Sequence, residues 1–158
     1  MISPERTHRP GDADPTPRRR TPWHVWVVGI AALLWSSVGA MDYVMTQTQN
    51  EAYMSQFSAE QLEFFYGFPS WLVAFWAIAV WGGVLGAVLL LLRRKLAVGV
   101  LAASFIAMVI VTIRNYLFAG GLEVAGDTFS LVFTAVIFVV ALLLVLYALG
   151  LDRRGMLH

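Results

Sequence analysis

Four long runs of apolar residues constrain this chain more than any other feature. They cover residues 23–45, 69–92, 96–118 and 129–151. At about 1.5 Å per helical residue, some 20 apolar residues cross the roughly 30 Å hydrocarbon layer of a bilayer. Backbone groups inside lipid must be satisfied within their own segment, which a helix achieves. The runs therefore predict an all-α integral membrane protein, a bundle of four transmembrane helices.

The composition agrees with a membrane protein. Of the 158 residues, 59% are hydrophobic and 13% are charged, whereas a soluble domain is closer to half apolar and a quarter charged. The chain has no cysteine, which excludes disulfides, thiol nucleophiles and thiolate metal sites. Its three histidines, His8, His24 and His158, form no metal-ligand spacing. We therefore expect no metal site and no cofactor.

The segments outside the apolar runs complete the domain organisation. Residues 1–22 hold five of the six prolines and few large apolar side chains, too few to offset the entropy of ordering. We expect a disordered cytoplasmic basic tail there, a transmembrane domain over residues 23–151, and a second cytoplasmic tail over residues 152–158. A cleavable signal peptide that ends near residues 38–40 is the alternative for the first run. The length of that run and the bulky Trp35 near its end favour a retained helix.

Basic residues predict the orientation in the membrane. Lysines and arginines cluster in the N-terminal tail, in the short turn at residues 93–95, and at Arg153 and Arg154. Four spans place these three segments on one side, and most acidic residues on the other. Basic residues in short loops stay in the cytoplasm. We therefore expect a protein of the bacterial inner membrane with both termini in the cytoplasm.

The connection over residues 46–68 is the one substantial extracytoplasmic element. Within it, Ser58 and Gln61 fit a capping box, in which each side chain satisfies a backbone amide of the other residue. Apolar and aromatic residues follow at positions 62–66. This pattern predicts a short helix that lies in the membrane interface. A plain topological connector is the alternative.

Asp42 and Arg114 are the charged residues inside the predicted spans. Asp42 follows Trp23 by 19 residues, and Arg114 follows Leu96 by 18. At 1.5 Å per residue, both lie roughly 27 to 29 Å from the cytoplasmic boundary. The two side chains can therefore meet at the same depth, and the sequence predicts an intramembrane ion pair.

Small residues on the same helix faces allow both charges to point inward. Helical spacing places Gly39 and Trp35 on the face of Asp42. It places Ala107, Ala103 and Gly99 on the face of Arg114. A structural clamp is the favoured interpretation of the pair. The alternatives are a functional pair, and two side chains that reach separately to the outer headgroups.

Two further sets of residues are candidates for packing or function. Polar residues of the first and third spans that could line a cavity are Ser36, Ser104, Thr112 and Asn115. The alternative role for these residues is interhelical hydrogen bonding, worth about 0.6 to 2 kcal/mol each. Gly82 and Gly86 form a G-x-x-x-G packing face in the second span. Whether this face packs within the chain or against another copy is open.

Three stretches of the chain carry a resemblance to known sequences: WHVWVVGIAALLWSSVGAMDYVMTQTQNEAYMSQF, FYGFPSWLVAFWAIAVWGGVLG and RRGML. They resemble an uncharacterised family of small four-helix inner-membrane proteins of proteobacteria. The resemblance covers nearly the whole chain beyond Pro22 and implies the same four-helix fold. Some members of the family carry the label "sugar transporter", without a catalytic or binding motif. In that family an asparagine often occupies the position of Ser36.

The sequence contains no nucleophile–base arrangement, phosphate-binding loop or metal cluster, so we do not expect an enzyme. The arginines of the tail lack the folded surface and interleaved aromatic residues that nucleic-acid recognition needs. We expect an accessory, assembly or regulatory role in the bilayer, as a homo-oligomer or with a membrane protein partner. The alternative is a transporter of a small, sugar-like solute. Because four apolar helices leave little room for a pathway, transport is expected to need an oligomer.

Overall fold

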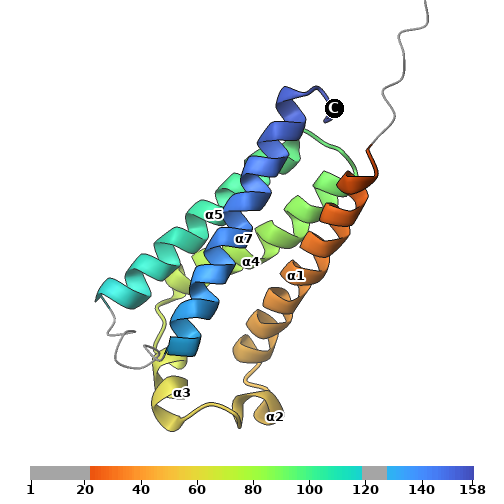
Figure 1. Cartoon of the computed structure of the whole chain (residues 1–158). Helices are drawn as coiled ribbons and strands as arrows, with labels where there is room; N and C mark the ends of the chain where they lie inside the picture. The colour runs from red at the N-terminus through yellow and green to blue at the C-terminus, as the bar shows by residue number, and fades with distance from the viewer. Residues whose placement is uncertain (1–21, 119–127) are drawn as a thin grey trace, which may run out of the picture.

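The computed structural model describes residues 22–118 and 128–158, which form an all-α bundle (Figure 1). No strand occurs within these two ranges. Four helices are long and apolar enough to cross a membrane. They are α1 (Trp23–Gln47), α4 (Ser70–Leu91), α5 (Leu96–Ile113) with its continuation η1 (Arg114–Phe118), and α7 (Thr128–Arg153). The predicted bundle of four long apolar helices is confirmed.

The helix bounds follow the apolar runs of the sequence. The run predicted over residues 69–92 corresponds to α4, which begins directly after the extended residue Pro69. Apart from Pro22, the predicted N-terminal tail lies outside the described residues. The glycine-rich connection at residues 119–127 also lies outside them.

The third membrane helix changes its winding before it ends. α5 stops at Ile113, and η1 continues it as a π-helical turn. A π turn is closed by i→i+5 hydrogen bonds, so it contains one residue more than an α turn. The α-helical spacing that placed side chains along α5 therefore does not hold beyond Ile113.

Two short helices, α2 (Glu51–Met54) and α3 (Ala59–Tyr66), occupy the connection between α1 and α4. The side chain of Asn50 caps α2 by accepting a backbone hydrogen bond. Ser58 Oγ accepts from the Gln61 amide at 3.2 Å, and Gln61 Oε1 accepts from the Ser58 amide at 3.0 Å. The helix predicted from this capping box is confirmed, whereas α2 was not predicted.

The α4–α5 pair forms the centre of the bundle. α1 packs on α4 and α7 packs on α5, while α1 and α7 approach each other much less. A Cβ atom at Gly82 would lie 2.9 Å from Ser104 Cβ, and one at Gly86 would lie 2.5 Å from Leu101 Cδ2. Both glycines therefore allow α4 and α5 to approach closely. The G-x-x-x-G face packs within the chain.

The turn between α4 and α5 lies beside the end of the chain. The Lys95 amide donates to the carbonyl of His158 (3.2 Å), and the His158 amide donates to the carbonyl of Arg93 (2.8 Å). Figure 1 shows the start of α1 at this same end, and α2 and α3 at the opposite end. We call these the basic end and the loop end.

A cluster of buried apolar residues, called the core below, lies at the basic end. It includes residues from all four long helices and from the C-terminal segment: Val25, Leu90, Ala97, Leu101, Ala148, Leu151 and Leu157. Across it, the Tyr147 hydroxyl and His24 Nδ1 share a hydrogen bond of 2.7 Å, which joins α7 to α1. Apolar packing is therefore tight at the basic end.

Candidate functional site

A cavity of about 580 Å³ lies between the four long helices, on the loop side of the core. Its volume falls within the range of roughly 300 to 1,000 Å³ that is typical of ligand pockets. Leu101 belongs both to the buried core and to the cavity wall. The core therefore forms the floor of the cavity, and Phe57, Phe65 and Phe68 line it at the loop end.

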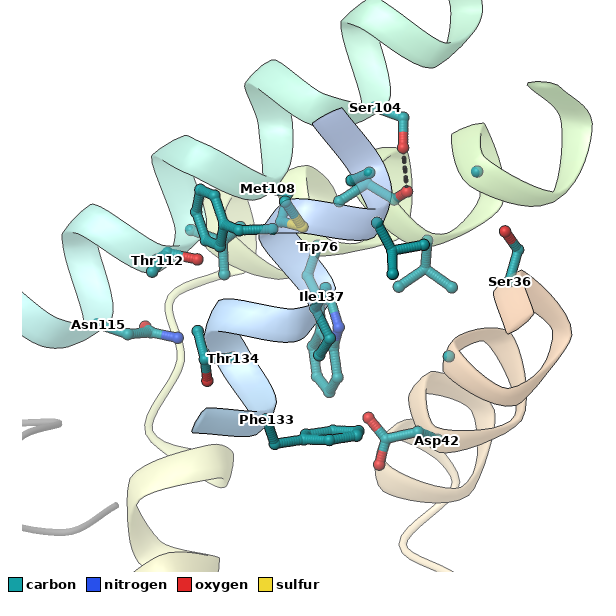
Figure 2. A pocket seen from close by; sticks show the side chains of 18 of the residues that line it. Ser36, Asp42, Trp76, Ser104, Met108, Thr112, Asn115, Phe133, Thr134 and Ile137 are labelled. Atoms are coloured by element: carbon teal, nitrogen blue, oxygen red, sulfur yellow. Dashed lines mark hydrogen bonds between the residues drawn. The ribbon is translucent and has the colours of Figure 1, made fainter. Parts of the chain in front are cut away.

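The four polar residues proposed above for a cavity all lie around this one. Figure 2 shows Ser36 on α1, and Ser104, Thr112 and Asn115 along α5 and η1. The Ser104 hydroxyl donates to the backbone carbonyl of Ala79, so it links α5 to α4. Asn115 Oδ1 is buried without a hydrogen-bond partner in the described part of the chain. Ser104 therefore serves helix packing, while Asn115 presents a free acceptor.

Asp42 is the one charged residue among the described residues of the wall. Figure 2 shows its carboxylate pointing into the cavity from α1. Its Oδ1 atom accepts a hydrogen bond of 2.5 Å from the Tyr53 hydroxyl, at the loop end. Burial, the hydrogen bond to Asp42 and the charge of Asp42 raise the pKa of Tyr53 to about 12. Tyr53 is therefore a stable donor at neutral pH.

Asp42 and Arg114 do not form the predicted ion pair in this structure. Arg114 is absent from the cavity wall, and its Nη1 atom is buried without a hydrogen-bond partner among the described residues. Of the small residues placed on one face with Arg114, Ala107 is buried, whereas Gly99 and Ala103 are exposed. Equal depth was therefore not sufficient, because the π turn η1 begins at Arg114 and the α-helical spacing of α5 no longer sets the direction of its side chain.

Aromatic rings form much of the remaining wall, and sequence reasoning did not identify them as a group. They are Trp35, Tyr53, Phe57, Phe65, Phe68, Trp76, Tyr116, Phe129, Phe133 and Phe138. The rings of Trp35 and Phe133 are 6.4 Å apart and bring α1 and α7 into contact. The hydroxyls of Tyr116 and Thr134 lie 3.1 Å apart and join η1 to α7. The only sequence signal for Tyr53 is the helix cap at Asn50, three residues before it.

The wall offers one carboxylate, several hydroxyl and amide groups, and ring faces. These groups bind a small molecule by hydrogen bonds, charge and stacking. Within the two described ranges, no three His, Asp or Glu side chains are grouped as metal ligands. No protein-family model, curated protein or solved structure matches the chain. The functional argument is therefore based on the geometry of the cavity.

Proposed function

We propose that the protein is a membrane transporter of a small solute, which binds in the cavity between α1, α4, α5 and α7. The observation that carries the proposal is this cavity of about 580 Å³ within the membrane-spanning helices of a single chain. From the sequence, we expected four apolar helices to leave too little room for a solute pathway, so that transport would need an oligomer. A single chain has the room because α1 and α7 pack against different helices of the α4–α5 pair and diverge.

The two ends of the bundle differ in packing. Such a difference is needed in a transporter whose binding site is accessible from one side at a time. The packed core closes the basic end, with Leu101 at the cavity floor. The cavity extends in the other direction, to the aromatic residues near α2 and α3. Transporters open one side of a fixed site at a time. We propose that the solute enters at the loop end, and that release on the other side requires the core helices to separate.

We place the basic end in the cytoplasm of a bacterial inner membrane, with both termini on that side. The turn at residues 93–95 and the C-terminal segment lie together at this end. Arg153 and Arg154 lie in that segment and add positive charge to it. Basic residues of short loops remain cytoplasmic. The aromatic residues at the loop end of the cavity then lie towards the extracytoplasmic side.

The accessory or assembly role was based on the extracytoplasmic loop and on the G-x-x-x-G face of α4, which could have packed against another protein. Gly82 and Gly86 instead face Ser104 and Leu101 of the same chain. That face is therefore occupied in the monomer, and it offers no surface to a partner. We give solute transport precedence for this reason.

Uptake into proteoliposomes tests the proposal with a matched pair of variants. Gly39 lines the cavity, and a Cβ atom there would meet nothing within 4 Å, so Gly39→Phe extends a ring into the cavity. Gly99 has the same free space but is exposed outside the cavity, so Gly99→Phe is the control. From a panel of radiolabelled sugars, amino acids and organic cations, we expect uptake by the wild type and by Gly99→Phe. We expect Gly39→Phe to lose about tenfold or more.

Circular dichroism and size-exclusion chromatography establish that each variant is folded before uptake is compared. Equal uptake by Gly39→Phe and the wild type would contradict the proposal. So would wild-type uptake that never exceeds that of protein-free vesicles for any member of the panel.

A further inference from the structure

We infer that the solute of this cavity is a hydrophobic organic cation, held by the carboxylate of Asp42 and by the surrounding aromatic rings. The inference rests on the proposed function, because it names the substrate class of the same cavity. The charge and the ring faces of the wall favour a cation over a neutral solute.

Asp42 gives the cavity a negative charge. No Lys, Arg, His or Glu occurs among the described residues of the wall. A carboxylate within a membrane is costly unless a cation or strong hydrogen-bond donors compensate it. Tyr53 supplies one donor, to Oδ1, and Arg114 lies outside the wall. A bound cation would supply the missing opposite charge.

Aromatic rings line the cavity near the carboxylate of Asp42. Figure 2 shows Asp42, Trp76 and Phe133 projecting into the cavity from α1, α4 and α7. Trp76 is held by edge-to-face contacts with Tyr43 (centroids 5.0 Å apart) and Phe68 (6.1 Å). The face of an aromatic ring attracts cations, most strongly for tryptophan and more strongly when water is excluded. The rings also bury the apolar substituents of such a cation.

Uncharged polar groups of the wall add hydrogen-bonding capacity beside the carboxylate. Asn115 Oδ1 has no donor among the described residues, and Figure 2 shows Asn115 across the cavity from Asp42. The Ser104 hydroxyl already donates to Ala79. A neutral sugar would leave the charge of Asp42 uncompensated.

Isothermal titration of the purified full-length protein with tetraphenylphosphonium tests the inference. Tetraphenylborate has nearly the same shape and the opposite charge, so it is the matched ligand control. We expect the phosphonium to bind the wild type, and the borate to give no heat beyond that of empty micelles. Asp42→Asn should weaken phosphonium binding about tenfold or more. Asp42→Glu keeps the charge and should retain most of the affinity.

Asp152→Asn is the matched protein control, because Asp152 is acidic but lies outside the cavity wall. It should bind the phosphonium as the wild type does. Phe133→Leu provides a second variant in case Asp42→Asn fails to fold. It removes a ring and leaves the charge, so it should weaken binding roughly threefold to tenfold.

Three results would each overturn the inference. The first is unchanged phosphonium affinity in folded Asp42→Asn, or in Phe133→Leu if only that variant folds. The second is binding of the borate as tight as that of the phosphonium. The third is binding of glucose without binding of the phosphonium. The experiments also distinguish failure of the transport proposal from failure of the cation proposal. Gly39-dependent uptake of a neutral solute without cation binding would leave transport standing and reject the cation. Asp42-dependent cation binding without uptake of any solute would do the reverse.

Discussion

At the scale of single residues, the hydrogen bond from Tyr53 to Asp42 joins the loop end to a membrane helix. It gives the carboxylate a donor from outside the spans, at a depth where lipid offers none. Only Oδ1 is used, which leaves Oδ2 available in the cavity. Tyr53 thus stabilises the position of Asp42 without neutralising its charge.

Replacing Tyr53 by Phe should lower the free energy of unfolding by about 1 to 2 kcal/mol, because the carboxylate loses its donor. Titration with sodium dodecyl sulfate, followed by circular dichroism, measures this loss. Tyr66→Phe is the control, since Tyr66 is exposed and lies in the same connection. A loss that is equal in both variants would contradict a specific role for the Tyr53 hydroxyl.

The raised pKa of Tyr53 also predicts a pH dependence of stability. Its pKa is about 12 in the folded protein, against the ordinary tyrosine value of 10.0 that applies in the unfolded chain. The folded state therefore holds the proton more tightly, so the stabilisation is complete below pH 10 and is lost as the pH rises through 12. The melting temperature of the wild type should fall more steeply than that of Tyr53→Phe between pH 10 and 12. Parallel curves would rule out this linkage.

At the scale of helices, α4 determines how closely the bundle packs. Gly82→Ala would place a Cβ atom 2.9 Å from Ser104 Cβ and 3.4 Å from Ser104 Cα. These atoms lie on or next to the backbone, so they cannot rotate aside, and α4 and α5 must separate. We expect a loss of about 1 to 3 kcal/mol in unfolding free energy. Unfolding in dodecyl sulfate again gives the measurement.

Gly99→Ala is the control for Gly82→Ala, because a Cβ atom at Gly99 would meet nothing within 4 Å. Its stability should be unchanged or slightly higher, since alanine favours helices more than glycine does. If Gly82→Ala altered the oligomeric state and left stability unchanged, Gly82 would face another copy instead of α5.

The helices differ in how readily the sequence revealed them. The long spans and the capped α3 were predicted, because apolar length and a capping box are strong signals. α2 has only four residues, too few for periodicity to show. The π turn η1 has no sequence signature, and it begins at Arg114, where the α-helical extrapolation was most needed.

The candidate site was predictable only in its polar part. Ser36, Ser104, Thr112 and Asn115 interrupt apolar runs, and polar side chains in a span turn away from lipid. The aromatic wall was not predictable, because tryptophan and phenylalanine also face lipid readily. Trp76 lines the cavity while Trp71 and Trp81 of the same helix are exposed. Only the packing of α4 distinguishes them.

At the scale of the whole molecule, one end is packed and the other is hollow. The basic end holds the core and the C-terminal segment. The loop end holds α2, α3 and the aromatic residues that border the cavity. Because the two ends differ in packing, the orientation of the protein in the membrane determines which compartment each end faces.

Cysteine labelling measures the orientation of the protein in the membrane. The chain has no cysteine of its own, so only an introduced thiol can react. Gln56→Cys places a thiol at an exposed position between α2 and α3, and His158→Cys places one at the exposed end of the chain. In intact spheroplasts, a membrane-impermeant maleimide should label the thiol at position 56 alone. The thiol at position 158 should react only after permeabilisation. The reverse pattern would show that the basic end is extracytoplasmic.

The distribution of the six tryptophans allows intrinsic fluorescence to report whether the cavity is occupied. Trp35 and Trp76 border the cavity, while Trp23, Trp26, Trp71 and Trp81 are exposed outside it. Brominated lipid tails should quench the fluorescence of the outer four indoles more than that of Trp76. Occupancy of the cavity should change the emission of Trp35 and Trp76, which line it. Replacing the outer four with phenylalanine would leave a native signal that reports solute entry in real time, without any attached dye.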